Sequence, residues 1–239
     1  KFMMNGAVTT EYETIDREKL LEDIRSFVIV DAVKSVSCKT IREEKSEQGL
    51  YRVVLMDFGY KRNIVRSLKN RGCDVTIVPS DTPAEEILAM KPDGIMLSNG
   101  PGDPEENVEI IAQIKKLLDA DVPMFGICLG HQLTALATGA KTVKLKYGHR
   151  GANQPVRDLA HDRTYITSQN HGYAVQGDTV DPAVGEISHI NANDNTVEGV
   201  RYKEKACFTV QFHPEASAGP QDTSYLFDEF IAMMRKEAK

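Results

Sequence analysis

From Tyr51 onward, short apolar runs alternate with amphipathic segments, and this alternation constrains the fold more than any other feature of the chain. Val53–Met56 is an apolar run typical of a strand buried on both faces, and a helical pattern over 63–71 follows it and stops at Gly72. The alternation predicts further strands at 75–78, 95–97 and 123–127 and helices at 84–90 and 108–118. Repeated strand–helix units predict the α/β class, with an open, mostly parallel sheet covered by helices on both faces.

The pattern changes after about residue 141. Short β-type runs follow at 165–167, 187–190, 197–202 and 208–212, and an amphipathic helix is expected over Tyr225–Lys239. The sequence contains no internal repeat. We therefore expect one domain over residues 51–239.

The first fifty residues differ from the rest. Asp16 is a suitable N-cap for a helix reaching Phe27, whereas residues 42–49 (REEKSEQG) are polar, lack periodicity and are typical of a linker. The chain begins with Lys1, which suggests that it starts inside a longer polypeptide. We expect residues 1–50 to be an arm and linker, the remnant of an upstream N-terminal domain.

Composition excludes several classes of protein. Hydrophobic residues make up 41% of the 239, enough for a core, and no run approaches the roughly 18 apolar residues of a spanning helix. A net charge of −6 argues against a nucleic-acid binder that works through a basic face. The four cysteines form no CxxC pair and no metal-binding spacing, and no signal peptide is visible, so we expect a cytoplasmic protein.

The strongest chemical signal is Gly126-Ile-Cys128-Leu-Gly130, between an expected strand and the helical run 131–137. A nucleophile between two glycines at a strand-to-helix turn is typical of a nucleophile elbow. The turn leaves the thiol at a helix N-terminus, which favours the thiolate, and the amide of Leu129 can serve as an oxyanion donor. Cys38, Cys73 and Cys207 lack this context and are expected to be core residues.

A second signal is His213-Pro-Glu215, after the apolar run 207–212. Alternate residues of an extended segment share a face, so Glu215 can orient the imidazole while its other nitrogen faces a thiol. The five other histidines are expected to be surface or packing groups. We interpret His213 and Glu215 as base and orienter for Cys128.

A third signal is the loop Ser98–Pro104 (SNGPGDP), at the end of the strand expected at 95–97. Ligands of open α/β sheets bind at the carboxyl ends of the strands. The amide of Gly102 is the natural candidate for a second oxyanion donor, although an ordinary Pro/Gly loop would show the same pattern.

At these motifs the chain resembles the class I, triad-type glutamine amidotransferases, and within them the small subunits of carbamoyl phosphate synthetase. The narrower resemblance rests on 57–64 (DFGYKRNI), 98–104, 125–140 (FGICLGHQLTALATGA), 148–156 (GHRGANQPV), 166–175 (ITSQNHGYAV), 213–221 (HPEASAGPQ) and the helix-forming DREKLLEDIR of the arm. Most of the N-terminal domain normal in that family is missing. Because that domain contributes a residue to the glutamine site, the resemblance leaves glutamine affinity and docking to a partner open.

The resemblance implies roles for individual residues. Cys128 would be the nucleophile, His213 the general base, Glu215 its partner, and the amides of Gly102 and Leu129 the oxyanion hole. The glutamine site would also include the following residues: Gly100, Gln132, Asn170, Gly172 and Tyr173.

The resemblance further implies an activity and a partner. The chain would hydrolyse L-glutamine through a cysteine thioester, without a metal or cofactor of its own. Ammonia would pass through a tunnel to the large subunit, in a heterodimer or a larger assembly, where ATP, Mg²⁺ and bicarbonate are used to make carbamoyl phosphate for pyrimidine and arginine biosynthesis. The chain itself has no GxxxxGK[ST] loop for ATP.

Three alternatives remain open on sequence. The chain could serve anthranilate, aminodeoxychorismate or GMP synthesis, although the arm and GHRGANQPV argue against this. It could be a regulatory or scaffold module that retains a relic elbow. It could be an unrelated cysteine peptidase, which would leave the loop at Gly100–Gly102 and the Asn170-His171-Gly172 segment without a role.

Overall fold

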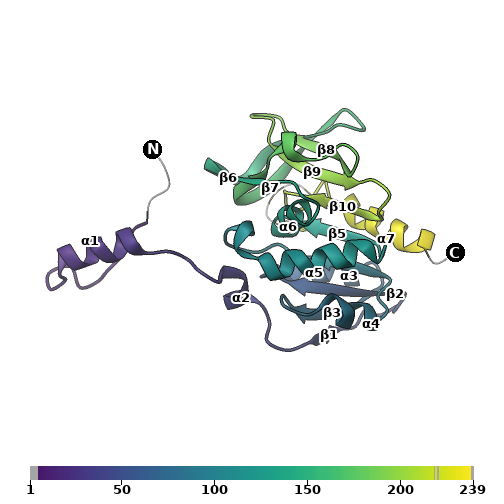
Figure 1. The fold of residues 1–239 in the computed structure, drawn as a ribbon, viewed down its shortest axis with the longest axis horizontal. Coiled ribbons are helices and arrows are strands. Elements are labelled where there is room, and N and C mark those ends of the chain that lie inside the picture. Colours follow the sequence, from purple (N-terminus) through teal and green to yellow (C-terminus); the bar gives the residue numbers. More distant parts are fainter. Residues whose placement is uncertain (1–4, 218, 220, 238–239) are drawn as a thin grey trace.

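The strands of the computed structural model, which describes residues 5–217, 219 and 221–237, form one mixed sheet (Figure 1). The ten described strands follow the order β1-β3-β2-β4-β5-β10-β9-β8-β6-β7. The five from β3 to β10 in this order run parallel, and the remaining pairings are antiparallel. The predicted open α/β sheet is confirmed.

The parallel half agrees with the alternation in the sequence. Its strands are β2 (Tyr51–Asp57), β3 (Cys73–Pro79), β4 (Gly94–Leu97), β5 (Met124–Ile127) and β10 (Cys207–Val210). Its helices are α3 (Arg62–Lys69), α4 (Ala84–Ala89), α5 (Val108–Asp119) and α6 (Leu129–Ala137). Each differs from its predicted range by only a few residues.

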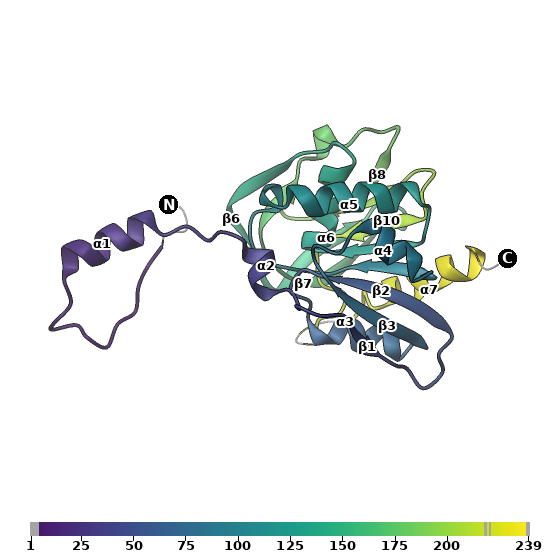
Figure 2. The same ribbon diagram turned by 60° about the horizontal axis from the view of Figure 1, so that its bottom comes forward.

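Two hydrophobic layers hold this half of the sheet between helices. Val54 and Met56 of β2 pack in the cluster that contains the buried sides of α4, α5 and α6. Val53 and Leu55 point to the other face, into the cluster of α3 and the C-terminal helix α7 (Tyr225–Glu237). Figure 2 shows α5 and α3 on opposite sides of β2. Burial on both faces explains why these strands are continuous apolar runs.

The antiparallel half is more extensive than the sequence predicted. It contains β6 (Thr142–Asp158), β7 (Arg163–Val175), β8 (Gly185–Asn191) and β9 (Val197–Tyr202). The 17-residue β6 was not expected, and only three residues of β7 were. Most side chains of β6 are not buried, and its register with β7 shifts twice, so the strand has no regular apolar alternation.

The N-terminal segment joins the sheet near its end. Helix α1 (Arg17–Ser26) is capped by Asp16 as predicted, buries none of its residues and projects away from the domain (Figure 1). Helix α2 (Ala32–Val36) packs on the domain through Ala32 and Val33. The expected linker at 42–49 is wrong in part, because β1 (Arg42–Glu44) pairs antiparallel with the edge of β3. All three side chains of β1 are exposed, so no hydrophobic pattern marked it.

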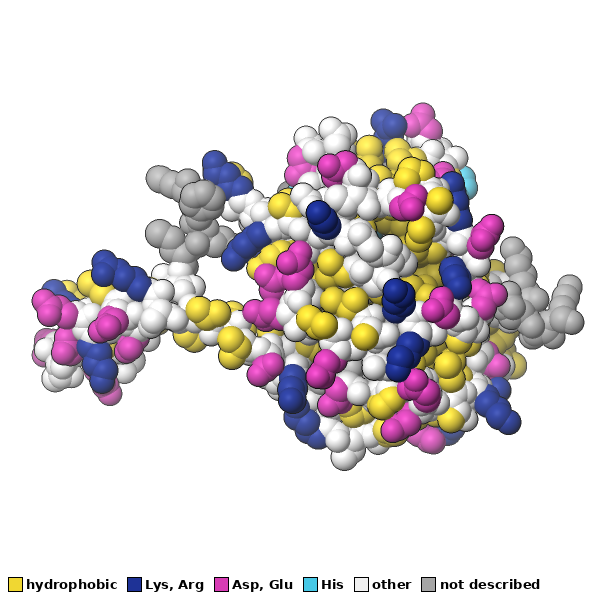
Figure 3. Space-filling view, viewed as in Figure 1, with side chains coloured by type: hydrophobic (Ala, Val, Ile, Leu, Met, Phe, Trp, Pro, Cys, Tyr) yellow, Lys and Arg dark blue, Asp and Glu magenta, His cyan; other side chains and the backbone are white. Residues whose placement is uncertain are grey.

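The predicted C-terminal helix reached Lys239, but residues 238 and 239 lie outside the described residues, as do Ala218 and Pro220 of the 213–221 segment. Among the described helices, none combines the length and apolarity that a membrane crossing requires. On the face drawn in Figure 3, acidic and basic side chains are interspersed, which fits the small net negative charge.

Candidate active site

The three sequence motifs meet at the carboxyl ends of β4, β5 and β10. The amide of Cys128, after β5, donates to the carbonyl of Val210 at the end of β10, at 2.8 Å. The amide of Gly130 donates to the carbonyl of Ser98, after β4, at 3.1 Å. The parallel sheet therefore brings the cysteine elbow, the glycine-rich loop and the histidine segment to one edge.

Cys128 occupies a strained turn between β5 and α6. Its backbone φ and ψ angles are 53° and −100°, a combination that residues other than glycine rarely adopt. A Cβ at Gly130 would lie 2.5 Å from the carbonyl oxygen of Leu97, so only glycine fits directly behind the elbow. The predicted nucleophile elbow is present, with Cys128 at the N-cap of α6 and 4% exposed.

His213 and Glu215 form the predicted pair, with His213 Nδ1 at 2.7 Å from Glu215 Oε1. The predicted geometry is wrong in one respect, because β10 ends at Val210 and the pair lies in the turn that follows. The amide of His213 donates to the carbonyl of Ser168 in β7 at 2.9 Å, which fixes the turn against the antiparallel half.

His213 and Glu215 each stabilise the charged form of the other. Burial lowers the pKa of His213, but the sulfur of Cys128 and the carboxylate of Glu215 outweigh burial and raise that pKa to about 9. Burial likewise opposes ionisation of Glu215, yet the imidazole of His213 and the ammonium of Lys61 lower the pKa of this carboxyl group. The geometry therefore favours an imidazolium held between a sulfur and a carboxylate.

Two residues that contact Glu215 were not singled out from the sequence. Lys61, at the N-cap of α3, places Nζ 3.4 Å from Glu215 Oε1, and the side-chain amide of Asn63 donates to the backbone carbonyl of Glu215. Both belong to the segment 57–64, to which no role was given. The sequence signal that could have identified them is a lysine and an asparagine at the start of a helix that follows a buried strand.

The backbone amides of Leu129 and Gly102 are the candidate donors to an oxyanion. Leu129 opens α6, so its amide has no acceptor within the helix. Gly102 has a φ of 94°, and no backbone acceptor for its amide is found among the described loops and turns. A Cβ at Gly100 would lie 2.8 Å from a side-chain carbon of Leu129, so the glycine-rich loop reaches the elbow.

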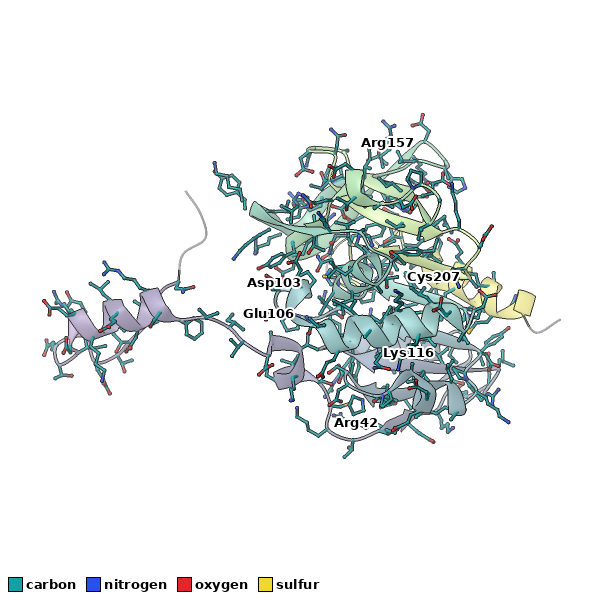
Figure 4. All side chains as sticks on the ribbon, viewed as in Figure 1. Arg42, Asp103, Glu106, Lys116, Arg157 and Cys207 are labelled. Atoms are coloured by element: carbon teal, nitrogen blue, oxygen red, sulfur yellow. The ribbon has the colours of Figure 1, made fainter. Side chains whose placement is uncertain are left out.

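Gln132 and Tyr173 connect the elbow helix to β7. Gln132 is buried, and its side-chain amide donates to the carbonyl of Tyr173 at 2.7 Å and to Gln211 Oε1 at 2.8 Å. Burial and the carboxylate of Asp103 raise the pKa of Tyr173 to about 12. Asp103, labelled in Figure 4 beside Glu106, belongs to the glycine-rich loop, so Tyr173 of β7 lies close to this loop.

Asn170 and Gly172 belong to the same stretch of β7. Asn170 is exposed, whereas His171 between them is buried, as expected from the alternation of a strand. Asn170 therefore shares a face with Ser168, whose carbonyl holds His213. Contacts through Ser168 and Tyr173 join β7 to the motifs, and Asn170 and Gly172 belong to the same stretch of this strand.

The remaining cysteines are buried in the core, as expected. Burial raises the pKa of the Cys73 thiol to about 12 and also raises the pKa of the Cys38 and Cys207 thiols. Thiols of this kind are poor nucleophiles. Cys128 is therefore the cysteine whose surroundings suit attack on a carbonyl group.

The arrangement has the parts of an acyl-transfer site. It offers a thiol at a helix N-terminus, an imidazole oriented by a carboxylate, and the backbone amide of Leu129 next to the thiol residue. The exposed side chain of Asn170 carries both a donor and an acceptor.

Comparison with known proteins identifies similar chains. The family model described as glutamine amidotransferase class-I matches residues 54–233. The carbamoyl phosphate synthase small chain of Bacillus cereus (strain ATCC 10987 / NRS 248) is 52% identical over 224 residues, which cover 94% of this chain and 60% of the relative. The small chain of Listeria monocytogenes serovar 1/2a is 53% identical over 223 residues, covering 93% and 61%. The chain thus spans about three fifths of the length of these curated relatives.

A solved structure agrees with the fold. A protein from Thermoplasma acidophilum, described as one of the subunits of a GMP synthase, superposes with a TM-score of 0.69 at 25% sequence identity. The match covers 79% of this chain and 96% of the other.

Proposed function

Because this chain belongs to the class I glutamine amidotransferase family, we propose that it hydrolyses L-glutamine to glutamate and ammonia through a thioester on Cys128. The observation that carries the proposal is the arrangement of Cys128, His213 and Glu215. One side of the imidazole is bound to Glu215 at 2.7 Å, and the pKa of the ring responds to the sulfur on the other side.

In the first half-reaction, the Cys128 thiolate attacks the side-chain amide carbon of glutamine. The new oxyanion accepts hydrogen bonds from the amides of Gly102 and Leu129. His213, as an imidazolium, donates its proton to the amide nitrogen, the C–N bond breaks, and ammonia leaves. A γ-glutamyl thioester and a neutral His213 remain.

In the second half-reaction, His213 acts as a general base. It removes a proton from water as the oxygen attacks the thioester carbon, and the Cys128 thiolate is then expelled. The product is glutamic acid, which ionises to glutamate, and the thiolate–imidazolium pair is restored. Glu215 keeps the ring oriented through both steps.

The glutamine side would be formed by the loop at Gly100 and by β7. Asn170, Gly172 and Tyr173 are proposed to bind the amino-acid head group, with Asn170 offering a donor and an acceptor. Gln132 would hold this segment in place through its hydrogen bond to the carbonyl of Tyr173. None of these steps needs a metal or cofactor.

We further propose that the ammonia serves carbamoyl phosphate synthesis on a separate large subunit, which would use ATP, Mg²⁺ and bicarbonate. The identity of 52–53% to carbamoyl phosphate synthase small chains over more than nine tenths of this chain supports this partner over the synthetase of GMP, whose structural relative is 25% identical. The same similarity supports our proposal that the chain acts in the cytoplasm, in pyrimidine and arginine biosynthesis.

The test is ammonia released from glutamine by the chain alone and with a carbamoyl phosphate synthetase large subunit. We expect the partner to stimulate glutamine hydrolysis and Cys128→Ala to abolish it in both conditions. Turnover that ignores this partner would contradict the assignment to carbamoyl phosphate synthesis. Turnover that survives in Cys128→Ala would contradict the glutaminase mechanism itself.

A further inference from the structure

A cluster of metal-ligating side chains lies on the buried side of β7, outside the catalytic arrangement. His149 of β6, His171 of β7 and Glu198 of β9 each offer one ligand atom, and these atoms all lie within 4.8 Å of one another. His171 and Glu198 are buried, with Glu198 0% exposed, and His149 is 9% exposed. A histidine, a second histidine and a carboxylate are a donor set that suits Zn²⁺.

The histidine rings are oriented as metal ligands usually are. His149 Nε2 lies 2.9 Å from Asp194 Oδ2, and His171 Nδ1 lies 2.7 Å from the carbonyl of Tyr173. When these nitrogens donate, the lone pairs are left on His149 Nδ1 and His171 Nε2. A carboxylate or carbonyl that holds the outer nitrogen is the usual second interaction of a zinc-bound histidine.

Several atoms that face the centre of this cluster are hydrogen-bond acceptors without a donor. Gln169 donates its amide to Thr167 Oγ1 at 3.1 Å, so its carbonyl oxygen faces His171 Nε2 at 3.0 Å. With its proton on Nδ1, which faces the carbonyl of Tyr173, His171 presents a lone pair at Nε2 to this oxygen. Among the described residues, Glu198 Oε2 also has no hydrogen-bond partner. Orphaned acceptors of this kind are what a cation would satisfy.

One ligand pair has the spacing of a metal site, and two nearby carboxylates have the charge that a divalent ion needs. Ligands about 2.1 Å from a tetrahedral zinc lie about 3.4 Å apart, and His149 Nδ1 is 3.3 Å from Glu198 Oε1. The carboxylates of Glu198 and Asp194 would balance a charge of +2. We propose that His149, His171 and Glu198 bind a Zn²⁺ ion, with Gln169 Oε1 adjacent as a fourth donor.

The ion would have a structural role and would connect β6, β7 and β9. His171 lies between Asn170 and Gly172, so a bound ion would fix the strand that carries them. The proposal does not depend on the proposed function, since none of the three ligands belongs to the Cys128–His213–Glu215 arrangement. Without an ion, His149 would instead bridge Glu198 and Asp194, whose oxygens lie 3.3 Å and 2.9 Å from its two ring nitrogens.

The test uses the full chain with Cys128→Ser, because the catalytic thiol would itself bind zinc. After treatment with a chelator and removal of the chelator, the chain is titrated with Zn²⁺, and bound metal is counted after gel filtration. We expect one ion per chain, lost in Glu198→Gln, and affinity about 10- to 100-fold weaker in Asp194→Asn. The matched control is His161→Gln, which removes an exposed histidine paired with Asp158 and should leave binding unchanged.

A second measurement keeps the proposal testable if a variant fails to fold. Co²⁺ added to the Cys128→Ser chain should give the strong visible absorption of a tetrahedral site without a thiolate charge-transfer band. Absence of bound Zn²⁺ after gel filtration, or binding that Glu198→Gln leaves unchanged, would overturn the proposal. Absence of bound Zn²⁺ would leave His149 as a bridge between Glu198 and Asp194.

Discussion

His213 Nδ1 lies 2.7 Å from Glu215 Oε1 in a turn beyond the end of β10, and Lys61 Nζ approaches the same carboxylate oxygen at 3.4 Å. A buried carboxylate is therefore shared between an imidazole and an ammonium group from the start of α3. This arrangement holds the imidazole ring in place and keeps Glu215 ionised despite its burial.

His213→Ala should reduce glutamine hydrolysis more than Glu215→Ala. General acid–base catalysis contributes about 10²- to 10⁴-fold, and an orienting group contributes part of that. We expect a loss of at least about 10³-fold for His213→Ala and about 10- to 10²-fold for Glu215→Ala. Steady-state ammonia release is the measurement, with circular dichroism to confirm folding. The opposite order would show that the two roles are assigned wrongly.

The pH profile should have an alkaline limb near 9. The pKa of His213 is raised above its ordinary value of 6.5 to about 9, so the imidazolium persists at neutral pH and loses its proton as the pH rises through about 9. Above that pH no proton is available for the departing ammonia, and kcat/KM should fall.

Glu215→Gln provides the matched test of this limb. It preserves the side-chain size but removes a charge that raises the pKa of His213, so the alkaline limb should move to lower pH. The sulfur of Cys128 still raises the pKa, so the shift should be partial. A limb that does not move would show that another group controls it.

Gly130→Ala should destabilise the fold and the elbow together. The added methyl group would meet the backbone carbonyl of Leu97 at 2.5 Å, a contact that cannot be relieved by rotating a side chain. We expect a loss of about 2 kcal/mol or more in the free energy of unfolding, measured by urea denaturation. Gly6→Ala is the control, because nothing lies within 4 Å of its added Cβ. Equal stability of the two variants would contradict this packing of the elbow against β4.

Asp16→Ala should affect helix α1 alone. Asp16 accepts hydrogen bonds from the amides of Glu18 and Lys19, and its loss should cost the helix about 1 kcal/mol. Because α1 buries no residue, faster amide exchange in α1 should accompany an unchanged midpoint of thermal unfolding for the domain. A lowered midpoint would show that α1 packs on the domain.

The parallel half of the fold could be predicted from the sequence, and much of the antiparallel half could not. β2 and β4 are buried on both faces and are continuous apolar runs. β6 is long, carries many exposed polar side chains and shifts register at Gly151, so its pairing depends on β7 rather than on its own pattern. β1 exists because the edge of β3 offers free backbone groups, which no side chain of β1 reveals.

The candidate site shows the same division. Cys128 could be found because a glycine-flanked elbow has a local pattern, and His213 because it follows an apolar run beside Glu215. Asn170 and Tyr173 could be named only through resemblance, and Lys61 was not singled out. Its contact with Glu215 joins distant parts of the chain, and the three proposed zinc ligands are likewise brought together by strand pairing rather than by spacing.

The most direct test of the account is the site of reaction of a glutamine-mimicking electrophile, located by mass spectrometry of the digested chain. The four cysteines provide an internal comparison, because Cys38, Cys73 and Cys207 are buried thiols with raised pKa values. We predict a single adduct at Cys128 whose formation is slowed by L-glutamine and abolished in His213→Ala. Adducts at another cysteine, or labelling of Cys128 that glutamine does not slow, would contradict the assignment of Cys128 as the glutaminase nucleophile.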